Sequence, residues 1–296
     1  MSEQAVLYDA PGPRAKRRVL VGTVFAGIVV AAVVAVVVLR LADADQFTMA
    51  KWGPLIDPGN ERFAAVWRVI GRGLVKTLTA AILAMVFSVV LGTLIAVGRL
   101  SLGKSGRIPL IGLVELLRGV PVVISIYFAS RVLPDAGLNF DALPGGGEMW
   151  YLVIGLTAYN MVIFAEVVRA GVLSLPRGQR EAALATGLTN GQAMRLVLLP
   201  QAFRIMLPAI ISQLVVVLKD TSLITFIGNY EELLGAGERL VQILRNPIQT
   251  FTAIAVIYIA INYSLSKLAQ YLERRLSQAG RRGAQAVEAQ TTTTGA

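Results

Sequence analysis

Residues 19–39 read VLVGTVFAGIVVAAVVAVVVL, an apolar run of 21 residues without a charged side chain. The hydrocarbon core of a bilayer is about 30 Å thick and takes about 20 helical residues to cross. Backbone N–H and C=O groups find no water there, so a run of this length must satisfy them internally as a helix. The stretch therefore predicts a membrane-spanning helix near the start of the chain.

The composition of the whole chain agrees with an integral membrane protein. Of the 296 residues, 55% are hydrophobic and 16% are charged, whereas soluble domains carry about 25% charged residues. Cys and His are both absent, which removes thiolate and imidazole metal ligands and the most common general base. We therefore expect no catalytic site, no metal site and no cofactor on this chain.

Five further apolar runs are long enough, or nearly so, to cross the bilayer. They cover roughly residues 74–97, 119–133, 149–168, 208–227 and 250–268. The run over 119–133 is short unless it begins near Ile108. The sequence thus predicts an all-α integral membrane protein with about six transmembrane helices. Apolar and basic side chains alternate at helical spacing over 60–73, which predicts an interfacial helix before the second span.

Lys and Arg residues gather in alternate connections between the predicted spans. If the chain crosses six times, most of the 28 basic residues fall on one side, and the loops around 134–148 and 228–240 on the other side carry acidic residues. Basic connections stay in the cytoplasm, so both termini are predicted to be cytoplasmic. Residues 1–18 form one tail and residues 276–296 a second, disordered one. The net charge of +10 is then explained by basic residues on the cytoplasmic side of the lipid bilayer, and no nucleic-acid partner is expected.

The first span has one alternative interpretation, a cleaved signal peptide. Ala42-Asp43-Ala44 resembles a small-residue cleavage site, but the apolar run of 21 residues exceeds the roughly 7–15 of a signal peptide. We therefore predict a retained N-terminal transmembrane helix, followed by an extracytoplasmic loop over 40–73.

One motif suggests nucleotide binding but lacks the required surroundings. Residues 98–105 read GRLSLGKS and match the phosphate-loop pattern G-x-x-x-x-G-K-[ST]. A working phosphate loop joins a buried strand to a helix within an α/β domain. Here the match begins at the end of an apolar run, and Pro109 and another apolar run follow. We interpret it as a basic turn at the lipid headgroups and expect no ATP site on this chain.

The most specific pattern lies in the longest basic connection, where residues 178–200 read GQREAALATGLTNGQAMRLVLLP. Its elements are Glu181-Ala182-Ala183, Gly187 after three residues, and Val197-x-Leu199-Pro200 after nine more. This spacing resembles the EAA loop of membrane subunits in ATP-binding-cassette (ABC) importers, with Val197 where the usual pattern has Ile. Other segments resemble the polar amino-acid uptake branch of that family: Ala158-Tyr159 with Glu166 and Arg169, residues 115–121, and Lys219-Asp220-Thr221-Ser222-Leu223.

The residues of this loop predict two short helices set at an angle. Pro176 suits the start of the first helix, and Gly187 suits its end because glycine readily takes positive φ. Asn190 is expected to cap a second helix that runs to about Leu199, and Pro200 to bend or end it.

The resemblance implies the type I fold of ABC importer permeases, with a five-helix core over 74–275 and the helix over 19–39 as an N-terminal addition. It also implies that residues 178–200 dock on a separate ATPase subunit. In that role Glu181 makes a polar contact, Ala182 and Ala183 allow close approach, and Gly187 forms the bend. Leu199 and Pro200 complete the motif.

The partners and substrate follow from the same resemblance. They are a pair of ABC ATPase subunits that bind the ATP, a second permease subunit that is identical or related, and an extracytoplasmic solute-binding protein. The chain is then a non-catalytic permease in the plasma membrane of a prokaryote. It passes a polar amino acid into the cytoplasm, with glutamate or glutamine favoured.

Ionisable residues at membrane depth are costly and usually face a cavity or one another. Glu166 and Arg169 lie three residues apart and are predicted to pair, and Glu115 and Arg118 repeat this arrangement. The candidates for the translocation path are Lys219, Asp220, Thr221, Ser222, Asn160 and Glu166. The group at 219–222 either holds the ammonium and carboxylate groups of an amino acid or joins its helix to neighbouring helices or a second subunit.

Two other classes of protein compete with an ABC permease. An ion-coupled secondary carrier often shows two repeated halves with broken helices, and no internal repeat is evident in this sequence. An integral membrane enzyme is disfavoured because His and Cys are absent.

Overall fold

The computed structural model describes the backbone of residues 12–294 and the side chains of residues 12–275. Over these residues the chain forms helices and no strands, which confirms the predicted all-α class. The chain divides near residue 63 into an N-terminal unit and a larger second unit.

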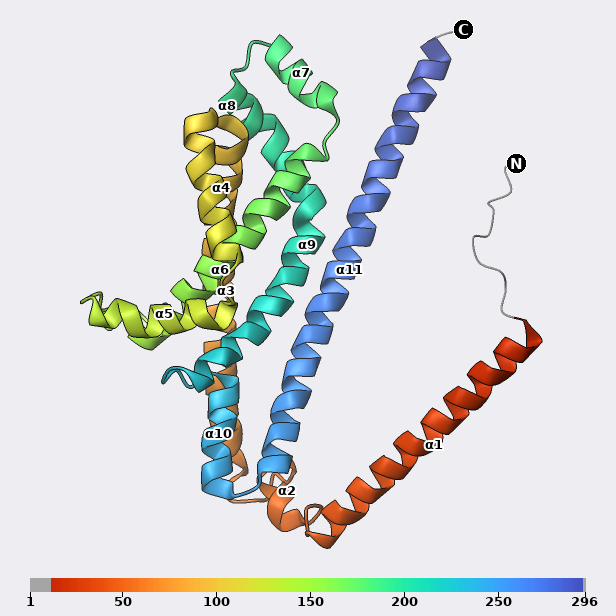
Figure 1. Cartoon of the computed structure of the whole chain (residues 1–296), viewed down its shortest axis with the longest axis vertical. Helices are drawn as coiled ribbons and strands as arrows, with labels where there is room; N and C mark the ends of the chain where they lie inside the picture. The colour runs from red at the N-terminus through yellow and green to blue at the C-terminus, as the bar shows by residue number, and fades with distance from the viewer. Residues whose placement is uncertain (1–11, 295–296) are drawn as a thin grey trace. The chain divides into compact units, whose positions relative to one another are not determined.

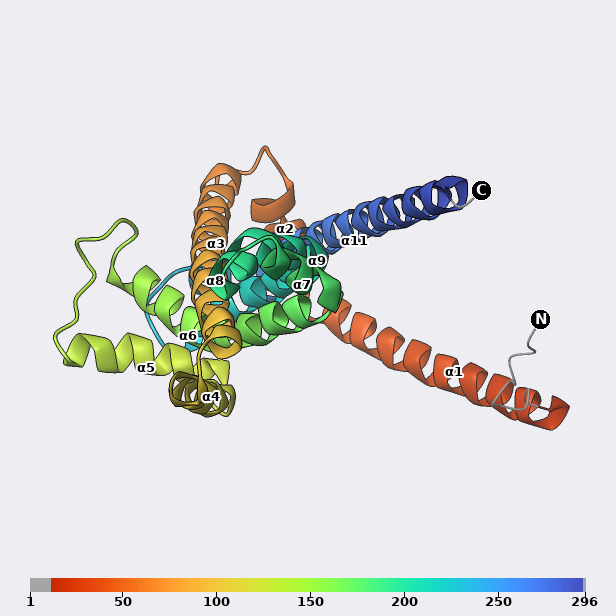
Figure 2. The ribbon, with the colours of Figure 1, turned by 90° about the horizontal axis from the view of Figure 1, so that it is seen from above.

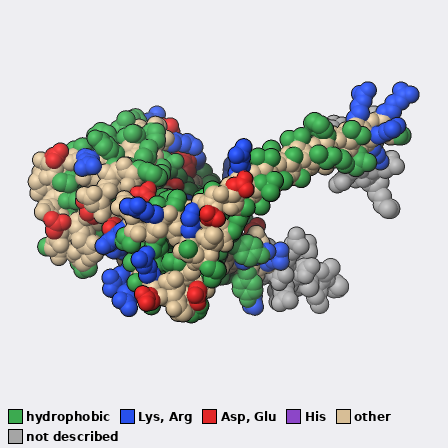
Figure 3. Space-filling model, turned by 90° about the horizontal axis from the view of Figure 1, so that it is seen from below, with side chains coloured by type: hydrophobic (Ala, Val, Ile, Leu, Met, Phe, Trp, Pro, Cys, Tyr) green, Lys and Arg blue, Asp and Glu red, His purple; other side chains and the backbone are tan. Residues whose placement is uncertain are grey.

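The N-terminal unit contains α1 (Pro13–Asp43) and the short α2 (Met49–Ile56). Pro13 suits the first position of α1 because its fixed φ is already helical and its missing N–H is not needed there. The 31 residues of α1 make a helix about 46 Å long, and none of them is buried. Figure 3 shows apolar side chains along the visible face of α1 and basic side chains at its far end. These features agree with the predicted first span.

The spans of the second unit are formed by α3 (Phe63–Ser101), α4 (Lys104–Arg118), α5 (Val122–Asp135), α6 (Gly147–Leu173), α9 (Leu199–Asp220) and α11 (Pro247–Thr294). Counting α1, five helices of the described chain are long and apolar enough to cross a membrane, or six if α4 and α5 form one broken span. The predicted number of about six is consistent with this count.

The third predicted span is broken, not straight. α4 and α5 are bent by 98° at Gly119-Val120-Pro121, and Figure 1 shows α5 running across the direction of α4. Pro121 has no N–H to donate and forces the preceding residue out of the helical region. The helix therefore stops at Arg118 and restarts after Pro121.

The predicted interfacial helix over 60–73 is continuous with the second span. Those residues from Phe63 onward are the first part of α3, whose 39 residues make a rod about 58 Å long. The first part of α3 is in close contact with another helix at Gly73. A Cβ added at Gly73 would lie 2.7 Å from Ala236 Cβ and 3.0 Å from the backbone oxygen of Glu232. The missing side chain lets α10 (Leu233–Leu244) pack directly on α3.

The core of the second unit is formed by close contacts of α6 with its neighbours, and the views in Figures 1 and 2 place α6 among α3, α5 and α9. A Cβ on Gly92 of α3 would lie 2.6 Å from Phe164 Cβ, and a Cβ on Gly155 of α6 would lie 2.5 Å from Ile126 Cα of α5. Both glycines thus allow the helices to approach closely. Around them, α3, α5, α6 and α9 bury a shared cluster that includes Met85, Leu152 and Leu218.

Short helices cap the two ends of this bundle. At one end lie α7 (Arg177–Ala185) and α8 (Asn190–Ala193), and α10 lies at the opposite end (Figure 1). A π-helical turn, η1 (Met194–Leu198), joins α8 to α9, and a 3₁₀ turn, η2 (Thr221–Phe226), follows α9.

The C-terminal tail differs from the expected disorder over 276–296. The backbone of α11 continues as a helix to Thr294, and the last two residues lie outside the described part of the chain. Residues 284–290 read AQAVEAQ, and Ala, Gln and Glu are good helix formers.

Candidate coupling loop and translocation path

The first half of the 178–200 loop is α7, which ends in a Schellman motif. The N–H of Leu188 donates to Ala183 O at 3.3 Å, and the N–H of Gly187 donates to Leu184 O at 3.0 Å. Gly187 has φ +88°, as predicted. This left-handed conformation costs free energy for a residue with a Cβ but not for glycine, so Gly187 stabilises the turn between the two helices.

The second half of the loop differs from the sequence prediction in two respects. Thr189, not Asn190, caps α8, through a capping box in which its side chain accepts from Gln192 N and Gln192 Oε1 accepts from Thr189 N. Asn190 instead accepts a hydrogen bond at 2.9 Å from Arg180 Nη2 of α7, which ties the two helices together. Thr189 is one residue earlier than the expected cap, and its hydroxyl reaches the third helical N–H.

Pro200 does not end the second helix. The N–H of Leu199 reaches back five residues to Met194 O, so the chain takes a π-helical turn before Pro200. Pro200 then occupies the first turn of α9, where its lack of an N–H costs little. The wider turn lets the second helix of the loop continue into the fifth span.

The predicted coupling residues lie on two different sides of the loop. Glu181 and Ala182 are exposed, whereas Ala183 is only 6% exposed and packs inside the loop. Ala183 is therefore covered by its own chain, and its part in the ATPase contact stays a prediction. Leu199 is half-buried and Pro200 is exposed.

An apolar cluster fixes the loop to the spans. Met194 and Leu198 of η1 are buried with Ala96 of α3 and with Val168 and Val172 of α6. Beside the cluster is a hollow of about 520 Å³. It is lined in part by Leu100, Leu175, Pro176, Arg180, Glu181 and Leu184. The apolar cluster thus holds η1 against α3 and α6, while most of α7 stays exposed.

Glu166 forms the predicted ion pair with Arg169, at 2.9 Å, and a second one with Arg99 of α3 that the sequence analysis missed. The side chains of Arg99 and Glu166 are 12% and 26% exposed, so the pair is largely shielded from water. Glu166 is thereby engaged in joining α3 to α6. The second predicted pair is wrong: Glu115 and Arg118 are both exposed and do not pair with each other.

The phosphate-loop match has the surroundings expected of a turn. Its residues end α3 and begin α4, with Gly103 as the N-cap of α4, and no strand precedes it in the described chain. Arg99 within the match is paired with Glu166. The match is therefore a helix–helix connection.

The candidate path residues at the end of α9 differ in exposure. Lys219 is exposed, Asp220 and Ser222 are half-buried, and Thr221 is fully buried. The hydroxyls of Thr221 and Ser222 donate to carbonyls one turn back. Within the described side chains, neither Lys219 nor Asp220 forms an ion pair.

Asn160 lies in the core between two spans. It is fully buried, its amide donates to Leu156 O, and its oxygen accepts from Gln213 Nε2 of α9 at 3.0 Å. Gln213 was not predicted, although a glutamine inside an apolar run is a signal of such a contact. Asn160 therefore joins α6 to α9 through hydrogen bonds that are satisfied within the chain.

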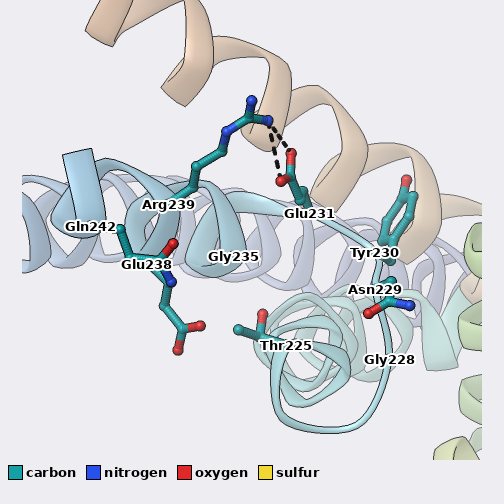
Figure 4. A pocket seen from close by; sticks show the side chains of 9 residues that line it. All are labelled: Thr225, Gly228, Asn229, Tyr230, Glu231, Gly235, Glu238, Arg239 and Gln242. Atoms are coloured by element: carbon teal, nitrogen blue, oxygen red, sulfur yellow. Dashed lines mark hydrogen bonds and ion pairs between the residues drawn. The ribbon is translucent and has the colours of Figure 1, made fainter.

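The α10 end contains a hollow of about 390 Å³, shown in Figure 4. Its rim includes Glu231 and Arg239, which form an exposed ion pair at 3.0 Å, and Glu238. Glu232, expected with these acids in an outer loop, is instead fully buried. The sequence signal for this was its position directly before the helical pattern of α10, where an acid can bind free N–H groups.

Within the described residues, no group of three or more acidic, His or Cys side chains is arranged to hold a metal ion.

Comparison with known proteins identifies the family. Residues 88–278 match the family described as "Binding-protein-dependent transport system inner membrane component". This chain belongs to that family. It is therefore a multi-pass inner-membrane permease of the ABC importer type, and a permease of this type is non-catalytic.

Similar proteins place the chain beside amino-acid permeases. It is 36% identical, over 81% of its length and 85% of the relative's, to the glutamate transport system permease protein of Corynebacterium glutamicum. It is 34% identical to the glutamate/glutamine/aspartate/asparagine transport system permease protein of Rhodobacter capsulatus, over 70% of this chain and 48% of that one. It superposes with a TM-score of 0.62 on the crystal structure of an amino acid ABC transporter with histidines. That match has 28% identity and covers 72% of this chain and 96% of the other.

These comparisons confirm the predicted resemblance to the polar amino-acid branch and the type I permease fold. None of them favours an ion-coupled carrier.

Proposed function

We propose that this permease passes a polar amino acid, with glutamate or glutamine favoured, into the cytoplasm, driven by ATP hydrolysis on a separate subunit. The substrate class rests on the names of the relatives, both of which include glutamate. The observation that carries the mechanism is the continuity of the 178–200 loop with α9.

The continuous helix from α8 to α9 can transmit a movement of the loop into the membrane-spanning part of the chain. From Asn190 through η1 to Asp220 the chain is helical and rises about 46 Å at 1.5 Å per residue. A push on α7 is passed to the second helix through the Arg180–Asn190 hydrogen bond and the Schellman turn at Gly187. It then reaches Lys219 and Asp220 at the far end of α9. ATPase movement at one end thus displaces polar side chains at the other.

The proposed ATPase contact is the exposed surface of α7, part of which lines the hollow of about 520 Å³. Glu181 and Ala182 are exposed there, and Leu184 keeps 38% of its surface exposed. A carboxylate beside small and apolar side chains suits a protein groove with a basic rim. Leu199 and Pro200 set the direction in which the loop leaves the membrane.

The proposed assembly contains two ATPase subunits, a second permease subunit that is identical or related, and an extracytoplasmic solute-binding protein. The basic α7–α8 end faces the cytoplasm, and both termini lie on that side. The acidic and basic rim residues at the α10 end then face the binding protein.

Lys219, Asp220, Thr221 and Ser222 are proposed to lie on the path or at the interface with the second permease. Lys219 and Asp220 offer one cation and one anion without an ion-pair partner in the described chain, and these are the charges that an amino acid needs. Such charges at membrane depth require a ligand, water or a partner subunit. Asn160 and Glu166 join α6 to α9 and α3, and their proposed role is to fix the positions of the helices that surround the path.

Co-purification with the ATPase subunit tests this function. Glu181→Arg is expected to abolish ATPase association and uptake of labelled glutamate or glutamine, because it reverses the exposed charge of α7. Glu61→Arg, the same change at an exposed site outside the second unit, is expected to keep both. Retention of ATPase binding and uptake by Glu181→Arg would contradict the proposed contact.

A further inference from the structure

Glu232 is a buried carboxylate that accepts five hydrogen bonds from four elements. Its Oε1 accepts from Leu234 N at 2.8 Å, from Gly235 N at 3.0 Å and from Thr225 Oγ1 at 2.8 Å. Its Oε2 accepts from Thr77 Oγ1 at 2.9 Å and from Tyr258 OH at 2.8 Å. The donors come from α10, η2, α3 and α11, and we call this set the Glu232 cluster.

The cluster is stabilised by hydrogen bonds and not by a cation. Glu232 is 0% exposed, and none of the ion pairs formed by the described side chains includes it. Its carboxylate lies at the N-terminus of α10, where free N–H groups and the helix dipole favour negative charge. Thr77 Oγ1 also accepts from Leu233 N at 2.9 Å, so α3 is tied to the same turn of α10 twice.

One of the five bonds leads to the candidate path. Thr225 belongs to η2, which directly follows Lys219-Asp220 in the chain. Thr225 is also part of the wall of the hollow at the α10 end, where Figure 4 shows its side chain facing the α10 residues. Gly235 comes close to it, since a Cβ on Gly235 would lie 3.5 Å from Thr225 Oγ1. A displacement of α10 is therefore passed to η2 through Thr225 and Glu232.

We infer that Glu232 is a positioning residue for transport, which holds η2 to α10 so that contact at the α10 end moves residues 219–226. The inference rests on the proposed function, in which the α10 end receives the binding protein. Charge-assisted hydrogen bonds are about twice as strong as neutral ones, so a single carboxylate can hold η2, α10, α3 and α11 in register. Thr225 is the only one of its five donors that comes from η2.

The test measures amino-acid uptake per ATP hydrolysed by the complete importer in proteoliposomes, with labelled glutamate and glutamine as probes. Thr225→Val removes the hydroxyl and keeps the shape of the side chain. We expect it to lower the uptake per ATP by about tenfold, because a hydrogen bond to a charged group is lost. Thr252→Val is the matched control, since Thr252 is exposed on α11 and its hydroxyl donates only to Ile248 O. Reduced folding would lower uptake and hydrolysis together and leave their ratio unchanged.

Three further variants keep the inference falsifiable if Thr225→Val assembles poorly. Thr225→Ser retains the donor and is expected to stay near the wild-type ratio. Glu232→Gln keeps an acceptor for the backbone N–H groups and is expected to retain a higher ratio than Glu232→Ala. A wild-type ratio for Thr225→Val would overturn the inference. So would a ratio for Thr225→Ser well below that of the wild type, or a ratio for Glu232→Gln no higher than that of Glu232→Ala. Failure of the wild-type complex to take up either amino acid would instead contradict the proposed function.

Discussion

Gly92→Ala is expected to separate α3 from α6 and destabilise the permease. The added Cβ would lie 2.6 Å from Phe164 Cβ, 2.7 Å from Met161 O and 2.9 Å from Ala165 N. Non-bonded carbon atoms prefer about 3.5–4.0 Å, so the two helices must move apart by about 1 Å. Two of the three atoms belong to the backbone of α6 and cannot turn away.

The expected magnitude is the difference between two opposing effects. Overpacking of a tight contact costs about 1–3 kcal/mol, whereas Gly→Ala within a helix gains about 1 kcal/mol. Gly71→Ala supplies the second effect alone, because a Cβ at Gly71 of the same helix has nothing within 4 Å. We therefore expect Gly92→Ala to be less stable than Gly71→Ala by about 1–3 kcal/mol.

Unfolding of the purified permease by SDS in mixed micelles measures this difference. Phe164 and Ala165 of this contact lie beside Glu166 on α6, which pairs with Arg99, so uptake by the assembled importer is expected to fall with Gly92→Ala. Equal unfolding free energies for the two variants would refute the argument that Gly92 is required by the approach of α6.

Two further predictions concern the loop and the ion pair. Gly187→Ala is expected to weaken ATPase binding roughly 5- to 30-fold, because the left-handed conformation at φ +88° costs an L-residue about 1–2 kcal/mol. The control Gly191→Ala, whose added Cβ would have nothing within 4 Å, is expected to bind the ATPase normally. A binding titration that shows no difference between the two variants would contradict the role of the turn. Arg99→Leu and Glu166→Leu are each expected to destabilise the permease more than the double variant does, because a single change leaves an unpaired charge in a shielded site. If the loss of unfolding free energy in the double variant equals the sum of the losses in the two single variants, this coupling is excluded.

Several features were predictable because they depend on local chemistry. The apolar runs require helices in lipid wherever they occur, and the pairing of Glu166 with Arg169 follows from their spacing on one helix. Gly187 ends α7 because few other residues take its backbone angles. The family was recognisable because the motif of the 178–200 loop is short and its spacing is strict.

Other features were missed because they depend on which segments meet. The break at Pro121 turned one expected span into two helices at 98°, and the π-helical turn before Pro200 joined two elements that were expected to be separate. Ala183 turned inward because the neighbouring helices cover that side of α7. Glu115 and Arg118 have the same spacing as Glu166 and Arg169, but they do not pair.

The sequence by itself determined that the chain crosses a membrane as helices, that residues 178–200 carry a motif with the spacing of the ABC importer family, and that the chain has no thiol or imidazole side chain. Those conclusions follow from hydrophobicity, residue type and spacing along one chain. Only the tertiary structure decided that Arg99 meets Glu166 and that Glu232 is buried with donors from four elements. Such contacts join residues as much as 155 positions apart, and the burial of a carboxylate is set by the helices that surround it.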